Sequence, residues 1–103
     1  MLNRAWVYED SPIVVGALIT DEYFERDYIW SVTVARNWQK RGIATALIAQ
    51  AEKNFGELHL HTEPFSEGAR LYTKLGWTPV KTEFDYYGPG ADAVLMVKRN
   101  VDV

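Results

Sequence analysis

The sequence predicts a single α/β domain over residues 1–103, built on a mixed, mostly antiparallel sheet with a central parallel β-α-β unit and two main helices. Two observations about pattern predict this class. Apolar and polar residues alternate near both ends of the chain, and a helical period replaces that alternation in two internal stretches. The third observation is size, because 103 residues, 48% of them apolar, fit one domain with its own core.

The N-terminal elements are predicted to form a hairpin. Residues 4–8 and 13–19 are rich in β-branched and aromatic side chains, and the turn-forming segment 9–12 separates them. The charged stretch 20–27 is expected to be a loop containing a helical turn.

A strand–helix–strand unit follows. Residues 28–35 alternate as a strand, which places Tyr28, Trp30, Val32 and Val34 on one face. Residues 43–55 have a helical period, and its apolar stripe consists of Ile43, Leu47, Ile48, Ala51 and Phe55. Gly56 is expected to end this helix. Residues 58–62 alternate again, so the two strands should be parallel and their crossover right-handed.

The C-terminal elements are a helix and two strands. Residues 66–75 are predicted to be helical, with Ser66 as the N-cap and Gly76 as the stop. Strands are predicted at 77–86 and 93–99, joined through residues 87–92.

Composition excludes several classes of protein. The net charge of −3 and a pI near 5.3 argue against general nucleic-acid binding. There is no cysteine, which excludes disulfides, thiolate metal sites and a cysteine nucleophile. Neither a signal peptide nor a membrane-spanning run is recognisable, so a cytoplasmic protein is expected.

The segment 39–45 has the properties of an anion cradle. It leaves a strand that is predicted to be parallel and enters a helix, whose first N–H groups are unpaired and carry partial positive charge. Gly42 removes the side chain that would keep a diphosphate away from those amides, and Ala44 is small. Gln39, Lys40, Arg41 and the Thr45 hydroxyl supply further donors.

The sequence from Val34 to Ala44 resembles the pyrophosphate motif of the GNAT acetyltransferase superfamily. In that motif Gln or Arg is followed by two residues, Gly, one residue and Gly or Ala, after a strand that ends in valine. The resemblance implies that acetyl-coenzyme A is the co-substrate and that the amides of Gln39, Lys40, Arg41, Gly42, Ile43, Ala44 and Thr45 hold its pyrophosphate. It also implies that the backbone of Val32, Thr33 and Val34 pairs with the pantetheine arm. Arg36 replaces the proline that is common in the family.

A second segment, from Ser66 to Trp77, is similar to the family's second helix. There an asparagine is followed at fixed spacing by Ala, an apolar residue, Tyr, Gly and an aromatic residue. Ser66 stands in place of the asparagine, where it caps the helix or meets pantetheine with a shorter reach. The resemblance implies that Tyr72 protonates the departing coenzyme A thiolate, a transfer that a phenol can make as charge develops on sulfur.

The general base is less evident. The corresponding strand face offers Tyr28 and Trp30, which do not accept a proton from an ammonium at neutral pH. Among the carboxylates Glu22, Asp27, Glu63 and Asp85, Glu63 is the best placed to act through water. His59 and His61 alternate on a strand with no evident third ligand, so a structural or cleft-lining role is expected and no metal site is predicted.

Family members usually begin with a strand and two helices that wall the acceptor side, and this pattern is missing here. Exposed apolar residues would then favour a homodimer or a partner protein that completes the wall, unless the rings pack a smaller domain. The predicted function is transfer of an acetyl group to an amine, of a small molecule or a protein, by direct attack. The alternatives are a non-catalytic module that binds coenzyme A or a protein, and a nucleotide-binding module of another fold.

Overall fold

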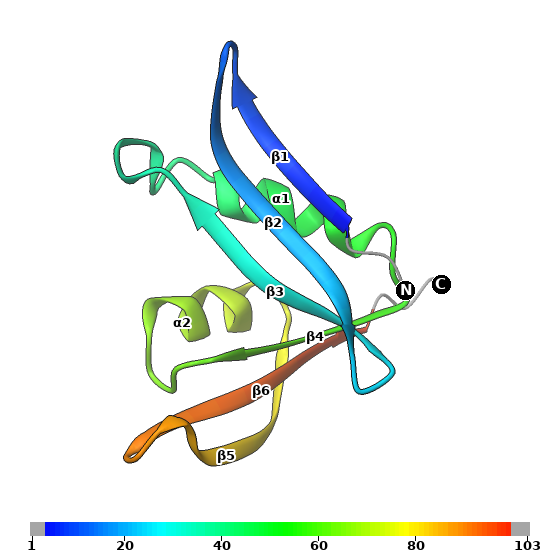
Figure 1. The fold of residues 1–103 in the computed structure, drawn as a ribbon, viewed down its shortest axis with the longest axis vertical. Coiled ribbons are helices and arrows are strands. Elements are labelled where there is room, and N and C mark those ends of the chain that lie inside the picture. The colour runs from blue at the N-terminus through cyan, green and yellow to red at the C-terminus, as the bar shows by residue number, and fades with distance from the viewer. Residues whose placement is uncertain (1–3, 100–103) are drawn as a thin grey trace. The chain divides into compact units, whose positions relative to one another are not determined.

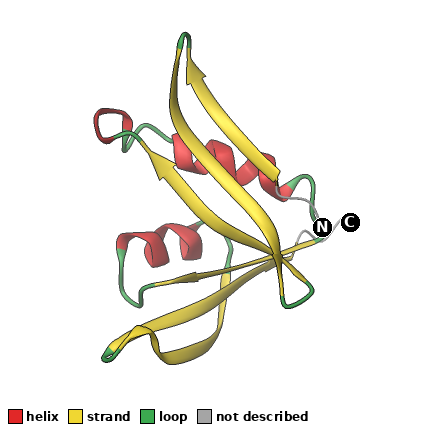
Figure 2. Cartoon of the chain, in the orientation of Figure 1, coloured by secondary structure: helices red, strands yellow, loops and turns green. Residues whose placement is uncertain are grey.

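A computed structural model describes residues 4–99 (Figure 1). Within this range the chain forms six β-strands and two α-helices of a mixed sheet, which confirms the predicted fold class (Figure 2). The chain divides into two compact units, one over the described residues up to Leu58 and the other over His59–Arg99. The strand order is β1-β2-β3 in the first unit and β4-β6-β5 in the second.

Three antiparallel strands form the sheet of the first unit: β1 (Arg4–Asp10), β2 (Ile13–Tyr23) and β3 (Arg26–Val34). The loop predicted for residues 20–27 is wrong. β2 and β3 pair down to Tyr23 and Arg26, and only Phe24 and Glu25 form the turn. The charged residues misled the prediction because carboxylates on a two-stranded end can face water without leaving the strand.

A β-bulge interrupts the β2–β3 pairing. Ile19 pairs with Ser31, while the next residue, Thr20, pairs with Ile29, so Trp30 is the extra residue on β3. A single extra residue reverses the facing of the side chains beyond it. The predicted common face of Tyr28, Trp30, Val32 and Val34 therefore does not exist, and Tyr28 is 5% exposed while Trp30 is 50% exposed.

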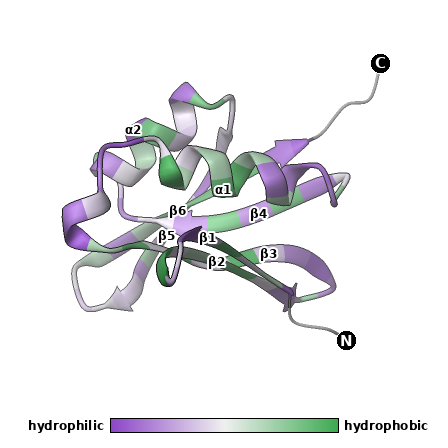
Figure 3. Cartoon of the chain, turned by 90° about the horizontal axis from the view of Figure 1, so that it is seen from above, coloured by the Kyte–Doolittle hydropathy of each residue, from purple (hydrophilic) through white to green (hydrophobic). Residues whose placement is uncertain are grey.

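Helix α1 (Ile43–Glu52) packs on β1, β2 and β3 and makes the core of the first unit. Four of the five predicted stripe residues lie inside it and are buried: Ile43, Leu47, Ile48 and Ala51. Figure 3 shows the helix as mainly hydrophobic and turning hydrophilic at its C-terminal end. It approaches β2 closely at Gly16, where a Cβ atom would lie 2.9 Å from Ile43 Cγ2.

The predicted stop of α1 at Gly56 is wrong by about one turn. The helix ends at Glu52, and Asn54 accounts for this, because its side-chain amide donates to the Gln50 carbonyl at 2.9 Å. The Asn54 backbone N–H bonds the Ala51 carbonyl at 3.0 Å, which tightens the last turn. Phe55 consequently leaves the helix and lies edge-on to Trp6 of β1.

The second unit contains β4 (Glu57–Thr62, from His59 onward), α2 (Glu67–Lys74), β5 (Thr78–Gly88) and β6 (Ala91–Arg99). β5 and β6 form an antiparallel hairpin whose turn is shorter than the predicted link 87–92. Its buried side chains include Leu60, Trp77, Ala93 and Met96. Among the described residues, no helix is both long and apolar enough to cross a membrane.

Candidate functional site

The predicted cradle begins where β3 ends. A short 3-10 turn (Arg36–Trp38) follows the strand, and α1 then starts at Gly42, which is its N-cap with φ of 81°. Lys40 also has a positive φ, 64°. Glycine is the residue that tolerates this conformation, and no side chain of the described residues caps the helix. The first-turn amides of α1 are thus turned outward without a side-chain acceptor, as an anion site requires.

Two polar side chains brace the cradle. Gln39 Nε2 donates to the Val34 carbonyl at 3.1 Å, which ties the loop to the end of β3. One terminal nitrogen of Arg41 donates to the Asn37 carbonyl at 3.0 Å, and its guanidinium lies 4.7 Å from the Trp38 ring centre. The loop is therefore held in shape by its own residues, with the exposed charges of Lys40 and Arg41 at its surface.

The cradle is open enough to receive a pyrophosphate. No described atom lies within 4 Å of the position that a Cβ atom on Gly42 would take. Arginine and lysine beside uncapped amides are the donors that phosphate oxygens need. The residues present therefore fit the diphosphate of coenzyme A, and Val32, Thr33 and Val34 lead into the cradle along β3.

Helix α2 carries the predicted acid. Ser66 is its N-cap as predicted, since its Oγ accepts from the Ala69 N–H at 3.1 Å and donates to the Glu63 carbonyl at 2.7 Å. At the other end Gly76, with φ of 93°, follows the last turn. Tyr72 lies half-buried with its ring centre 5.5 Å from that of Trp77, and burial raises the pKa of its phenol above the ordinary value. Tyr72 therefore keeps its proton at neutral pH, as a general acid must.

A cluster of titratable side chains in the second unit was missed by the sequence analysis. His61 Nε2 is hydrogen-bonded to Glu83 Oε2, and the side chain of His61 is only 5% exposed. Tyr86 stacks on the imidazole at 4.1 Å with an interplanar angle of 17°. The pair reaches over β6, where the small residue Ala93 pairs with Glu83 and is fully buried. No local sequence signal joins residues 61 and 83, because they lie on strands that are not neighbours.

Glu63 lies beside this cluster. Burial, and to a lesser extent the carboxylate of Glu63, raise the pKa of Tyr87 above its ordinary value. The structure thus groups the predicted site residues in two sets. The cradle with Val32–Val34 belongs to the first unit, and Glu63, Ser66 and Tyr72 belong to the second. Among residues 4–99, no three His, Cys, Asp or Glu side chains are arranged to hold a metal ion.

Comparison with known proteins gives consistent results. The family description "Acetyltransferase (GNAT) domain" matches residues 2–79. An N-alpha-acetyltransferase of Sulfurisphaera tokodaii is 32% identical over 79 residues, which are 70% of this chain and 47% of that protein. The chain spans between 33% and 49% of the length of the curated relatives that it matches.

Solved structures show the same fold at low sequence identity. The ribosomal-protein-S18-alanine N-acetyltransferase from Escherichia coli has a TM-score of 0.83 and 17% identity, and the match covers 98% of this chain and 71% of that one. An aminoglycoside 6′-N-acetyltransferase complexed with coenzyme A has a TM-score of 0.85, also at 17% identity, covering 98% and 74% of the two chains.

The mixed sheet, the two helices and the cradle at the start of α1 thus define the class of protein as one with the acetyltransferase fold. The matched family lies across both units of the chain. The protein belongs to the GNAT acetyltransferase family.

Proposed function

We propose that this protein is an acetyl-coenzyme A-dependent N-acetyltransferase that works as one GNAT domain over residues 1–103. The observation that carries the proposal is the start of α1, where an αL glycine, uncapped amides and two basic side chains coincide. Membership of the family supports the acetyl group as the cargo. Since the co-substrate is a cytoplasmic metabolite, we propose that the reaction takes place in the cytoplasm.

The cradle residues divide the binding of coenzyme A among them. The amides from Gln39 to Thr45 accept the pyrophosphate, and the charges of Lys40 and Arg41 neutralise it. The backbone of Val32–Val34 pairs with the amides of the pantetheine arm as an added strand would. Ser66, which already caps α2, offers its hydroxyl to the same arm.

The transfer itself is a direct displacement. The neutral amine attacks the thioester carbonyl carbon, a new C–N bond forms, and the C–S bond breaks. Tyr72 gives its phenolic proton to the leaving sulfur, a role that its raised pKa favours because it remains protonated. Glu63 removes the proton that the amine loses, through a water molecule.

We propose in addition that a second copy of the chain, or a partner protein, completes the acceptor side. Exposed side chains support this: Phe24 is 81% exposed and Trp30 50% exposed in the first unit, and Phe84 is 78% exposed in the second. Large apolar side chains exposed to this degree are typical of interaction surfaces. Size-exclusion chromatography with light scattering tests the homodimer, and a monomer at all micromolar concentrations would contradict it.

Thermal unfolding and a thiol-release assay test the proposed reaction. Excess acetyl-coenzyme A should raise the unfolding temperature, and Arg41→Gln should weaken that shift while the control Lys81→Gln, on β5, should not. Tyr72→Phe should lower the rate of coenzyme A release with amine acceptors and leave acetyl-coenzyme A binding intact. Binding without turnover over a broad amine and peptide panel would support the non-catalytic alternative. Absence of any binding would reject both.

A further inference from the structure

Four aromatic rings gather at the end of the first unit where β2 turns into β3. This ring cluster consists of Tyr23, Phe24, Tyr28 and Trp30. The ring centre of Tyr23 lies 4.5 Å from that of Phe24, 4.9 Å from Tyr28 and 5.1 Å from Trp30. Tyr28 is buried and fixes the cluster to the sheet, whereas Phe24 and Trp30 are largely exposed. The cluster therefore presents aromatic surface to solvent from a rigid base.

The turn that carries Phe24 has an unfavourable sequence. Phe24 and Glu25 have φ of 51° and 63°, so both central residues of this two-residue hairpin lie in the left-handed region. Asn-Gly and Asp-Gly are the residues that such turns favour, because a bulky side chain with positive φ is strained. Strain of this kind is typically retained where a side chain has a function. Here it holds the ring of Phe24 in solvent against Tyr23.

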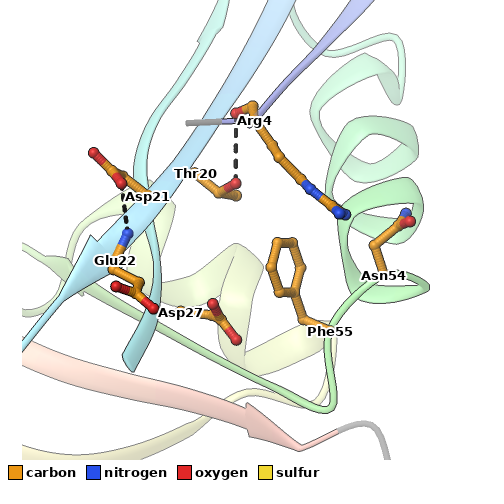
Figure 4. A pocket seen from close by; sticks show the side chains of 7 residues that line it. All are labelled: Arg4, Thr20, Asp21, Glu22, Asp27, Asn54 and Phe55. Carbon is orange, nitrogen blue, oxygen red and sulfur yellow. Dashed lines mark hydrogen bonds between the residues drawn. The ribbon is translucent and has the colours of Figure 1, made fainter. Parts of the chain in front are cut away.

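The surroundings of the ring cluster are acidic. Residues 21–27 contain four carboxylates, Asp21, Glu22, Glu25 and Asp27, and one basic residue, Arg26. Glu22 and Asp27 pair across the hairpin and line a pocket together with Thr20, Asn54 and Phe55. In Figure 4 both carboxylates lie at this pocket, while Asp21 points away from Phe55. Exposed π faces and carboxylates both attract cations, so the hairpin has the chemistry to bind a positively charged partner.

The position of the ring cluster along β3 connects it to the cradle. β3 runs from the hairpin at Arg26 to Val34, where the cradle begins. The four residues from Val34 back to Trp30 cover about 13 Å of extended strand. A pantetheine arm that follows Val32–Val34 from the cradle therefore delivers its acyl end toward Trp30 and the bulge. The rings then lie beyond the acyl group, on the side from which the amine approaches.

We infer that the ring cluster is the docking surface for a basic polypeptide segment, carried by a protein or peptide acceptor next to the amine that is acetylated. Lysine or arginine side chains would lie over the faces of Phe24 and Trp30, beside the hairpin carboxylates. The surface extends along the hairpin instead of enclosing a cavity, which suits a polypeptide better than a small amine. This inference rests on the proposed function for the position of the reactive amine.

The first test measures docking without catalysis. Two peptides with the same free N-terminus are compared by NMR titration of the full chain, one with lysines after the first residue and one with glutamines there. The lysine peptide should shift the indole N–H resonance of Trp30, and added salt should weaken the effect. Equal shifts with both peptides, no shift with either, or a shift with spermidine as large as with the lysine peptide would each overturn the inference.

The second test compares two exposed phenylalanines by steady-state acetylation of the same peptides. Phe24→Asn removes a ring of the cluster and installs a residue that tolerates positive φ, so the chain should fold. Its control is Phe84→Asn on β5, since Phe84 is 78% exposed compared with 81% for Phe24. Phe24→Asn should lower kcat/KM about two- to fivefold for the lysine peptide, the effect of losing one exposed cation–π contact, and leave the glutamine peptide unchanged. Equal losses in the two variants would refute the docking role.

The two tests also separate this inference from the proposed function. If the lysine peptide shifts Trp30 but no peptide is acetylated, docking stands and the proposed reaction fails. If both peptides are acetylated at the same rate by the wild type, the reaction stands and the docking surface is rejected.

Discussion

Gly16 controls how closely α1 approaches the sheet, and Gly16→Ala should therefore disturb both stability and cofactor binding. An added Cβ would lie 2.9 Å from Ile43 Cγ2, 3.3 Å from Leu47 Cδ1 and 3.4 Å from the Thr33 carbonyl oxygen. Carbon atoms prefer separations of about 3.5–4.0 Å, so the helix must move by roughly half an ångström or more. Overpacking of this kind costs about 1–3 kcal/mol. In a chain of this size each kcal/mol lowers Tm by about 4–8 °C.

The displacement matters for function because Ile43 is the first residue of α1, directly after Gly42. Moving it shifts the amides that form the cradle, so acetyl-coenzyme A should bind several-fold more weakly to folded Gly16→Ala protein. Calorimetric unfolding and isothermal titration measure the two effects. Gly56→Ala is the matched control, because no described atom lies within 4 Å of its added Cβ. An additional Ile43→Ala change should make the cost of Gly16→Ala smaller, as expected for residues in contact.

The reasoning would be refuted if Gly16→Ala had the Tm and the acetyl-coenzyme A affinity of the wild type. It would also fail if Gly56→Ala lost as much stability as Gly16→Ala.

Three further changes test the site. Gly42→Ala should weaken acetyl-coenzyme A binding, whereas Gly90→Ala, which also adds a methyl group at positive φ in open space, should lower stability by a similar amount of about 1 kcal/mol without affecting binding; titration calorimetry separates the two. Ser66→Ala should cost about 1 kcal/mol of stability through loss of the N-cap, measured by urea unfolding. Tyr72 has a folded pKa raised above its ordinary 10.0, so its stabilising effect is fully present below that pH and is lost as pH rises through the folded value; Tyr72→Phe should lose stability less steeply above pH 10.

Sequence pattern predicted the elements whose side chains repeat with a regular period. The buried stripe of α1 and the capping of α2 by Ser66 follow from local spacing, and the structure confirms both. The segment 20–27 was wrong because its charge suggested a loop, although cross-strand pairing with Arg26 and Asp27 holds residues 22 and 23 extended. Pairing between strands is a non-local property that composition does not encode.

The candidate site follows the same division. Gly42 was identified from its place between a strand and a helix, and its positive φ agrees with the reason given for glycine there. Trp30 was assigned to a regular face because nothing in a single strand's alternation indicates which residue its partner will skip. The contact between His61 and Glu83 depends on β6 lying between their strands and on Ala93 being small. Such a pair becomes visible only when strand order is known.

The ammonium of Lys98 has a consequence for the order in which the protein takes shape. Lys98 Nζ donates to the Leu75 carbonyl at 2.6 Å, so the end of α2 is held by a residue 23 positions later in the chain. Helix α2 has eight residues, none of them buried, and a helix this short is marginal by itself in water. During synthesis, Tyr72 therefore reaches its final setting only after β6 has left the ribosome. Release of the last strand is in this sense the step that completes the catalytic helix.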